Sequence, residues 1–244
     1  MNFKYIKIIM LLISILCSTN TIEFNDDDIF FKEMKEQIHL DDNLDWDIVQ
    51  EDEKIQVLNY RHQNIKIPAI KVVIIDSVNL HYLKEAITDV NNHIKFMQDS
   101  YLIISDSLYL GKKNFYKYND IIFYDTYQYL DLPFITDRHY VARAHLLDLE
   151  NIIKINWELL DRKFFKSYDI DKMNTKNKSI FIDRGFGYWE LEKLDEYKTK
   201  ATYCIYLNPR GWIPSFVINL SNLKVIPNTV KGMIEEAKRL QKLD

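Results

Sequence analysis

The C-terminal segment places the strongest restriction on the fold of this chain. Asn208-Pro209-Arg210-Gly211 interrupts a strand, and from Pro214 onward apolar residues recur at steps of three, four or one, which is helical spacing. A helix of roughly 28 residues would be roughly 40 Å long. Because proline removes a backbone hydrogen bond and crowds the preceding turn, Pro227 predicts a kink near Leu223. Such a helix needs a large apolar surface for its apolar face, which comprises Phe216, Val217, Leu220, Leu223, Ile226, Val230, Met233, Ile234, Ala237 and Leu240.

Most of the chain before this helix has the pattern of β-strands. The links between strands are short, which indicates an antiparallel sheet, and two short helices interrupt the strands, so the predicted class is α+β. In the last strand Tyr203, Ile205 and Leu207 share one face with Ala201, and we expect this face to point toward the final helix. The expected order is a hairpin over 46–62, a strand over 67–75, a helix from an Asn79 cap to about Val90, a short helix carrying His93, Phe96 and Met97, strands over 101–110, 115–130, 137–147 and 152–160, a polar loop over 163–178, and strands over 180–191 and 198–207.

The first twenty residues have the pattern of an export signal. Lys4 and Lys7 precede an apolar run from Ile8 to Leu16, and small residues follow. This run is about ten residues long, whereas a membrane-spanning helix needs about twenty. Cys17 stands where a lipoprotein signal places its lipidated cysteine; cleavage nearby without a lipid, or a buried N-terminal strand or helix, are the alternatives. We therefore expect an exported protein that is periplasmic, membrane-anchored or secreted.

Three regions follow from this pattern. Residues 1–20 are predicted to be the signal peptide and residues 45–243 the folded domain. Between them, residues 21–44 are acidic and amphipathic, and we expect them to be largely helical. One face of that helix would comprise Ile29, Phe30, Met34 and Ile38.

Charge and composition exclude several classes of protein. The formal net charge is -4, and about -6 without Lys4 and Lys7, which argues against a basic face that binds nucleic acid. After removal of the signal the chain keeps Cys204 and at most one other cysteine, Cys17. We therefore expect no intrachain disulfide framework. The 16 tyrosines and 13 phenylalanines, with only 5 glycines and 5 prolines, indicate a packed domain with few linkers.

The sequence contains few patterns that carry catalytic or metal chemistry. Gly185-Phe186-Gly187 lies inside a predicted strand and indicates a bend better than a phosphate-binding loop. His81 and Glu85 lie one helical turn apart, but two groups do not make a metal site. The acids over 41–47 match a calcium loop only in part, because Trp46 stands where that loop needs glycine. We therefore predict no catalytic residues, no metal and no cofactor.

Four motifs within residues 40–243 follow one another in a distinctive order. They are Trp46-Asp47 before a hairpin and Ile67-Pro68-Ala69; Leu132-Pro133-Phe134-Ile135-Thr136-Asp137-Arg138-His139-Tyr140-Val141; Gly187-Tyr188-Trp189-Glu190-Leu191; and Asn208-Pro209-Arg210-Gly211-Trp212-Ile213-Pro214 followed by a helix with an internal proline. On these motifs the chain resembles the START (StAR-related lipid transfer) domains, particularly bacterial START-like proteins.

The resemblance implies a helix-grip fold, in which a curved antiparallel sheet wraps around a long C-terminal helix and an internal hydrophobic tunnel lies between them. It implies that this tunnel binds one lipid or other hydrophobic molecule for carriage or sensing, without catalysis. The implied partners are that ligand and, transiently, a membrane, with a monomeric protein and no nucleic acid. Two alternatives remain: a polyketide-cyclase-like enzyme on the same fold, and a surface or interaction protein whose cavity is filled.

The resemblance also suggests candidate ligand contacts. Arg138 either gates the tunnel and touches a ligand head group, or pairs with an acid and pins the loop over 130–136. Several lipid-binding members have a second arginine six residues further on, where this chain has Ala144, and strand alternation predicts that Arg143 faces the other side. The candidate ligand-binding residues are Asp125, Tyr127, Arg138, Tyr140, Ala142, Ala144, Trp189, Tyr203, Phe216, Leu220 and Leu223.

Overall fold

The computed structural model describes residues 21–22, 32, 34–38, 44–63, 67–97, 100–107, 116–118, 121–133, 135–162, 179–211 and 213–243. Several predictions fall outside these residues. They are the signal peptide over 1–20 with Cys17, the polar loop over 163–178, the acids over 41–43, and the side chains of Ile29, Phe30, Phe134 and Trp212.

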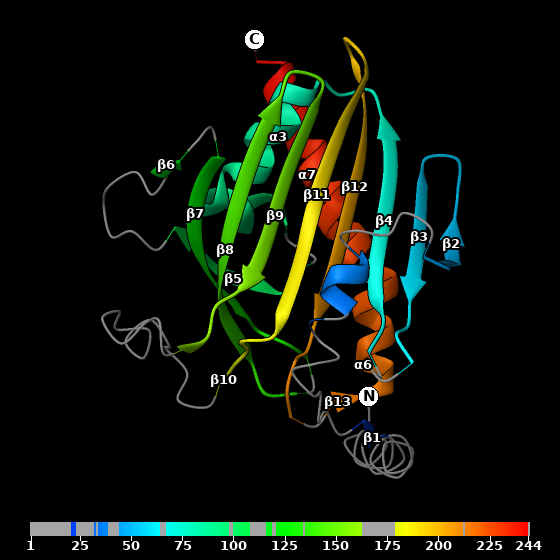
Figure 1. Ribbon diagram of the computed structural model, residues 1–244, viewed down its shortest axis with the longest axis vertical. Coiled ribbons are helices and arrows are strands. Elements are labelled where there is room, and N and C mark those ends of the chain that lie inside the picture. The colour runs from blue at the N-terminus through cyan, green and yellow to red at the C-terminus, as the bar shows by residue number, and fades with distance from the viewer. Residues whose placement is uncertain are drawn as a thin grey trace, which may run out of the picture.

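In the described part of the chain, eleven strands form one curved sheet (Figure 1). The strand order is β2-β3-β4-β12-β11-β9-β8-β7-β5, with β6 beside β7 and β10 beside β8. A separate pair joins β1 to β13. The bounds are β1 Thr21–Ile22, β2 Asp47–Glu51, β3 Ile55–Tyr60, β4 Ala69–Asp76, β5 Leu102–Ser107, β6 Tyr116–Tyr118, β7 Ile121–Leu130, β8 Arg138–Leu149, β9 Ile152–Leu159, β10 Ile180–Phe181, β11 Gly185–Asp195, β12 Lys198–Leu207 and β13 Ile213–Pro214.

The predicted antiparallel pairing is confirmed along the main path of this sheet. One pair differs, because β10 runs parallel to β8, with Ile180 opposite Arg138. The prediction rested on short links between consecutive strands, whereas β10 follows the long connection over 163–178. The rule for hairpins therefore does not apply to β10.

Two short helices lie where the sequence predicts them. Helix α3 (Leu80–Thr88) begins at Asn79, whose side chain accepts a hydrogen bond of 2.8 Å from the His81 backbone N–H. This is the expected N-cap, which satisfies a backbone donor that the helix itself cannot pair. The 3-10 turn η2 (Val90–Asn92) and helix α4 (His93–Phe96) follow directly.

The C-terminal helix consists of three consecutive parts. Helix α6 (Ser215–Leu220) leads into a π-helical turn, η5 (Ser221–Val225), and then into α7 (Ile226–Gln241). Pro227 is in the first turn of α7, so its missing N–H leaves a gap in the hydrogen-bond ladder that the wider turn accommodates. Where the sequence predicted a kink near Leu223, the structure has a π-helical turn.

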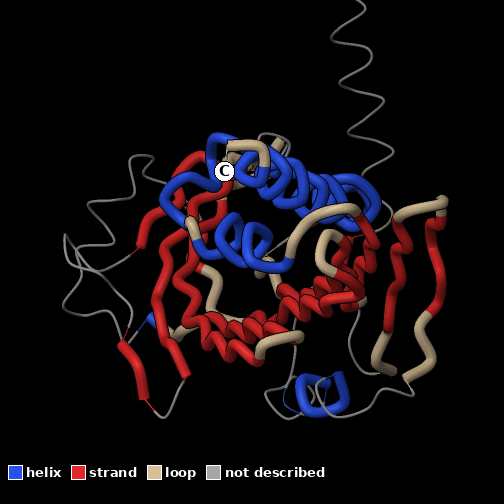
Figure 2. The backbone as a smooth tube through the Cα atoms, turned by 90° about the horizontal axis from the view of Figure 1, so that it is seen from above, coloured by secondary structure: helices blue, strands red, loops and turns tan. Residues whose placement is uncertain are grey.

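Helices α3, α4, α6 and α7 lie on the concave side of the sheet (Figure 2). The main hydrophobic core lies between α3, α7 and the facing strands, and includes Leu83, Val72, Leu191 and Ile234. Helix α4 comes very close to α7, because a Cβ at Gly232 would lie 2.6 Å from the Phe96 carbonyl oxygen. In the described residues, no helix is both long and apolar enough to cross a membrane.

A second hydrophobic cluster lies on the convex side of the sheet. Residues 34–38 are helical and lie on this side of the sheet (Figure 2). Met34 and Ile38 are buried there against Phe186, Cys204 and Tyr206. Burial raises the pKa of the Cys204 thiol to about 12. The N-terminal segment therefore adds a partial third layer on the face opposite the helices.

Candidate functional site

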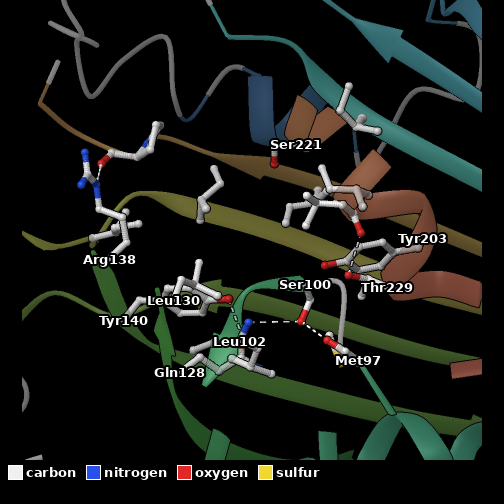
Figure 3. A pocket seen from close by; sticks show the side chains of 18 of the residues that line it. Met97, Ser100, Leu102, Gln128, Leu130, Arg138, Tyr140, Tyr203, Ser221 and Thr229 are labelled. Atoms are coloured by element: carbon white, nitrogen blue, oxygen red, sulfur yellow. Dashed lines mark hydrogen bonds between the residues drawn. The ribbon is translucent and has the colours of Figure 1, made fainter. Parts of the chain in front are cut away.

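A cavity of about 250 Å³ lies between the concave face of the sheet and the C-terminal helix (Figure 3). Its walls come from alternate residues of the strands, from α3 and α4, and from one side of the α6–η5–α7 helix. The strands contribute Ile70, Tyr124, Thr126, Gln128, Leu130, Arg138, Tyr140, Ala142, Ala144, Ile155, Trp157, Trp189, Tyr203, Ile205 and Leu207. The helices contribute Ile87, Val90, His93, Met97, Val217, Ile218, Ser221, Asn222, Val225, Ile226, Thr229 and Met233.

Strand alternation explains which residues of β7 and β8 reach the cavity. Even-numbered residues of both strands line it, because successive side chains point to opposite faces of a sheet. In the antiparallel register Ala142 lies opposite Thr126 and Ala144 lies opposite Tyr124. Each alanine places a methyl group where a larger residue would fill the space, so these two positions keep the cavity open.

Aromatic side chains form the opposite part of the strand wall. The rings of Trp189 and Tyr203, on neighbouring strands, are stacked with centroids 4.4 Å apart and planes 27° apart. Gly187 gives room to the Trp157 ring, because a Cβ there would lie 2.5 Å from Trp157 Cζ2. The sequence indicated a bend at Gly185–Gly187; in the structure this stretch pairs in continuous register within β11, and an aromatic side chain crosses Gly187.

Several polar groups interrupt these apolar walls. The Tyr140 hydroxyl donates a hydrogen bond to Gln128 Oε1, and the Thr229 hydroxyl donates to the Val225 carbonyl at 3.0 Å. Tyr203 makes its ring contact with Trp189, and its hydroxyl has no hydrogen-bond partner among the described residues. Burial raises the pKa of Tyr140 and Tyr203 above the ordinary value, so both phenols stay uncharged.

Arg138 stands at one end of the cavity and is 1% exposed. Its Nε donates to the Pro209 carbonyl at 2.7 Å, its Nη2 to the Arg210 carbonyl at 3.0 Å, and its Nη1 to the Thr136 carbonyl (Figure 3). Burial lowers the pKa of Arg138, while nearby Asp137 opposes this shift. Arg138 therefore ties β8 to the segment before α6.

The sequence left two roles open for Arg138. The structure supports the pinning role and changes its partners, since the three hydrogen bonds end on backbone carbonyls and not on a carboxylate. They also hold the 208–211 segment, which the prediction did not include. Arg210 in this segment has a positive φ of 50°, and its guanidinium forms an ion pair of 2.5 Å with Asp183.

His93 lies in the cavity wall at the start of α4 and is 5% exposed. Its Nε2 is 3.1 Å from the Ile87 carbonyl oxygen, and its Nδ1 has no hydrogen-bond partner among the described residues. A carbonyl only accepts, so Nε2 carries the proton in the neutral ring. Burial lowers the pKa of His93 to about 4, which keeps the ring neutral near pH 7.

Two predicted contacts on β7 lie on the wrong face of the sheet. Asp125 forms a bidentate pair with Arg143, with both N–O distances 2.8 Å, and the Tyr127 hydroxyl is 3.2 Å from His139 Nδ1. All four residues are odd-numbered and point away from the cavity. The prediction that Arg143 faces the other side is confirmed, whereas Asp125 and Tyr127 are corrected to the outer face.

Three predicted contacts on the C-terminal helix also miss the cavity. Phe216 is 41% exposed and Leu223 is 47% exposed, and Leu220 does not line the cavity. The prediction included a kink near Leu223 but kept the α-helical rotation per residue on both sides of it. The π-helical turn changes the rotation per residue, so the cavity-facing series recurs at steps of four, at Val217, Ser221, Val225, Thr229 and Met233.

The remaining predicted positions come together in the cavity wall: Arg138, Tyr140, Ala142, Ala144, Trp189 and Tyr203. Sequence reasoning missed Gln128, which the alternation from Tyr140 across the β7–β8 pair could have found. It also missed Ser221 and Asn222, because a search for apolar spacing passes over polar residues. Among the described residues, no group of three or more His, Cys, Asp or Glu side chains could hold a metal ion.

A curved antiparallel sheet around a long C-terminal helix, with a cavity between them, defines the START-like helix-grip fold. Comparison with solved structures supports this class directly. The sequence matches no protein-family model, and it matches no curated protein.

Three solved structures show the likeness. The STAR-related lipid transfer protein of Xanthomonas axonopodis is 17% identical, with a TM-score of 0.61, over 79% of this chain and 98% of that one. Human StAR-related lipid transfer protein 5 is 13% identical, with a TM-score of 0.64, over 86% and 94%. Human STARD10 is 14% identical, with a TM-score of 0.63, over 93% and 87%. At these identities the likeness establishes the fold.

Proposed function

We propose that the protein binds a lipid or another hydrophobic molecule in the cavity and carries it without chemical change. The observation that supports this most is the cavity of about 250 Å³ between sheet and helix, with largely apolar walls. Apolar burial contributes roughly 25 cal/mol per Å², so one acyl chain in such a site is held without a charged contact. Two of the structural relatives are named as lipid transfer proteins, which agrees with this proposal.

The cavity chemistry favours carriage over the two alternatives. An open cavity argues against an interaction protein with a filled core. A cyclase-like enzyme needs an acid, a base or an available arginine in the cavity. Three of the five N–H donors of Arg138 are engaged by carbonyls, and His93, whose Nδ1 has no partner among the described residues, is a weak base because burial lowers its pKa to about 4. We therefore place catalysis second.

Export, a monomeric state and transient contact with a membrane belong to the same proposal. Phe216 and Leu223 leave large apolar surfaces exposed on the outer side of the C-terminal helix. They are seven residues apart, which is about two helical turns, in the part of the C-terminal helix that precedes α7. An exposed pair of this kind suits brief contact with the lipid surface from which the ligand is taken.

Uptake from vesicles tests the proposal. Protein stripped of lipid is mixed with vesicles that carry labelled fatty acids, sterols or phospholipids, and the reisolated protein is examined by native mass spectrometry. We expect a mass increase equal to one ligand per chain. Absence of uptake across all three classes would overturn the proposal.

A cavity-filling substitution locates the ligand. Ala144→Phe should reduce uptake at least tenfold, because the added ring occupies the cavity where Ala144 now leaves room. Thr202→Phe is the matched control, since Thr202 lies on the opposite face of the sheet. Equal uptake by both variants would show that the ligand binds elsewhere.

A further inference from the structure

We infer that the outer edge of β2 binds a basic, extended segment of a partner protein, which joins the sheet as a further strand. This interaction surface is separate from the cavity and does not depend on the proposed carriage of a ligand. Three observations carry the inference: β2 ends the sheet, its apolar side chains are uncovered, and the negative charge of the chain gathers around it.

Strand β2 stands at the end of the strand order. Among the described residues it pairs with β3 on one side and with no strand on the other. Figures 1 and 2 show the β2–β3 hairpin at one lateral edge of the molecule, with β2 outermost. An edge strand presents backbone N–H and C=O groups with which an added strand can pair.

The side chains of β2 are uncovered. Ile48 is 55% exposed and Val49 is 38% exposed. On the neighbouring strand, by contrast, Ile55 and Val57 are buried in the main hydrophobic core. The core therefore ends at β3, and a strand beside β2 would cover apolar surface that the described part of the chain leaves open.

Exposed carboxylates surround these apolar side chains. Residues 45–54 contain five acids and one lysine, a net charge of -4, which equals the formal net charge of the whole chain. All five acids are exposed: Asp45, Asp47, Glu51, Asp52 and Glu53. Because the rest of the chain is neutral on balance, this edge is the part of the molecule that attracts a basic segment most strongly.

The pairing of β2 with β3 places one acid on each face of the edge. Asp47 lies opposite Asn59, and Glu51 lies opposite Gln56. Asn59 and Gln56 point to opposite faces of the sheet, because side chains alternate along β3. A partner strand with basic and apolar residues on both of its faces therefore fits β2.

The same acids argue against a second copy of this chain as the partner. Two β2 strands side by side would bring acids of both copies together, and like charges on neighbouring strands are destabilising. The register also shifts between Ile48 and Gln50, and such an irregularity limits indiscriminate pairing at an edge. A basic strand replaces the repulsion with attraction, so the edge selects its partner by charge.

Three short capped peptides test the inference. Lys-Lys-Val-Val-Lys-Lys-Val favours an extended strand and carries lysine and valine on both faces. Lys-Lys-Pro-Pro-Lys-Lys-Pro has the same charge, but its prolines cannot donate to a ladder. Glu-Glu-Val-Val-Glu-Glu-Val reverses the charge. Binding of labelled peptides to the full chain is measured by fluorescence anisotropy at about 0.15 M salt, where charges more than about 8 Å apart are screened.

We expect the basic valine peptide to bind about tenfold more tightly than the basic proline peptide, because only the former adds ladder hydrogen bonds. The acidic peptide should not bind. Amide hydrogen exchange over residues 47–51 should slow when the basic valine peptide is present, since its backbone pairs with the edge.

Charge reversal at the edge locates the site. The double variant Asp47→Lys/Glu51→Lys should weaken binding of the basic valine peptide about tenfold and allow the acidic peptide to bind. Glu85→Lys/Glu150→Lys is the matched control, because it changes the net charge equally at exposed positions of α3 and of the β8–β9 turn. The control should change neither result.

The remaining outcomes overturn the inference. Equal binding of the two basic peptides would show attraction by charge without strand addition, and unchanged binding to the Asp47→Lys/Glu51→Lys variant would place the peptide elsewhere. No binding of any peptide would remove the proposed partner, and a dimer of the wild type in analytical ultracentrifugation would put a second copy at the edge. The proposed carriage stands in each case, because no described residue of β2 or β3 lines the cavity.

Discussion

At the scale of single residues, His93 has the most measurable consequence. Its ring is buried and neutral, and burial lowers its pKa to about 4, below the ordinary value of 6.5. Between these two values the unfolded chain binds a proton at His93 and the folded chain does not. Stability therefore rises with pH across this window, and it is lost as the pH falls from about 6.5 toward 4.

This predicts an acid-sensitive contribution from one side chain. His93→Gln keeps an amide N–H that can donate to the Ile87 carbonyl and removes the titration. From the lowered pKa of His93, we expect the wild type to lose about 2–3 kcal/mol more than the variant between pH 7 and pH 4. Urea denaturation at several pH values measures this difference. Parallel curves for the two proteins would contradict the assignment.

The face of the sheet on which a side chain lies could be predicted along a strand with one residue already assigned. It could not be predicted on a strand where no residue had been assigned to a face. Tyr140, Ala142 and Ala144 follow from the step of two along one strand, once Arg138 is taken as inward. Asp125 was predicted as a ligand contact from the strand that precedes Arg138. Its partner Arg143 lies directly opposite on the next strand, so the pair belongs to the outer face and not to the site.

At the scale of elements, the C-terminal helix is built from two α-helical parts joined by a π-helical turn. The turn covers Ser221–Val225 and ends just before Pro227. Of its residues, Ser221, Asn222 and Val225 line the cavity. A wide turn has poorer hydrogen-bond geometry than an α-helix, so we expect the helix to be weakest where it borders the cavity.

Pro227→Ala tests whether the π-helical turn takes part in ligand exchange. The substitution restores an N–H that can donate to the carbonyl four residues earlier, which favours a regular helix. We expect ligand exchange with vesicles to slow several-fold, as followed by transfer of a fluorescent lipid. Lys231→Ala, at an exposed position of α7, is the control. Unchanged exchange in Pro227→Ala would mean that the turn only accommodates packing.

The order of the elements was predictable, whereas the rotation of the last helix was not. Asn79 marked the start of α3, and the strands lie close to their predicted ranges. The cavity-facing side of the final helix was misassigned because Phe216, Leu220 and Leu223 fit a continuous α-helical period. Spacing shows that a proline disturbs a helix, but the form of the disturbance depends on packing around it.

At the scale of the whole molecule, the two faces of the sheet have different tasks. The concave face borders the cavity, and the convex face is covered by the helical residues 34–38. Met34 and Ile38 are buried there, which agrees with a helical N-terminal segment. The overall architecture was predicted from ordered motifs that resemble START domains. The cavity volume could not be predicted from the sequence, because it depends on how side chains from many strands pack against one another.

Met34→Ala should therefore separate stability from binding. Met34 is fully buried, so its truncation should lower the free energy of unfolding by about 2–4 kcal/mol. Ligand affinity should stay unchanged, because the cavity lies on the other side of the sheet. Glu36→Ala, at an exposed position of the same helix, is the control in urea denaturation. A loss of affinity in Met34→Ala would show that the two faces are coupled.

The position of β4 beside β12 also has a consequence for how the chain folds. Val72 lies opposite Tyr203, so the early strands complete their hydrogen bonds only with a strand made much later. Bringing such distant segments together costs loop-closure entropy and slows folding. During synthesis β2–β4 must wait for β12, and the helix that closes the cavity emerges after all the strands of the sheet. We expect the ligand to be enclosed in the final folding step or to enter a finished protein, and not to bind the growing chain.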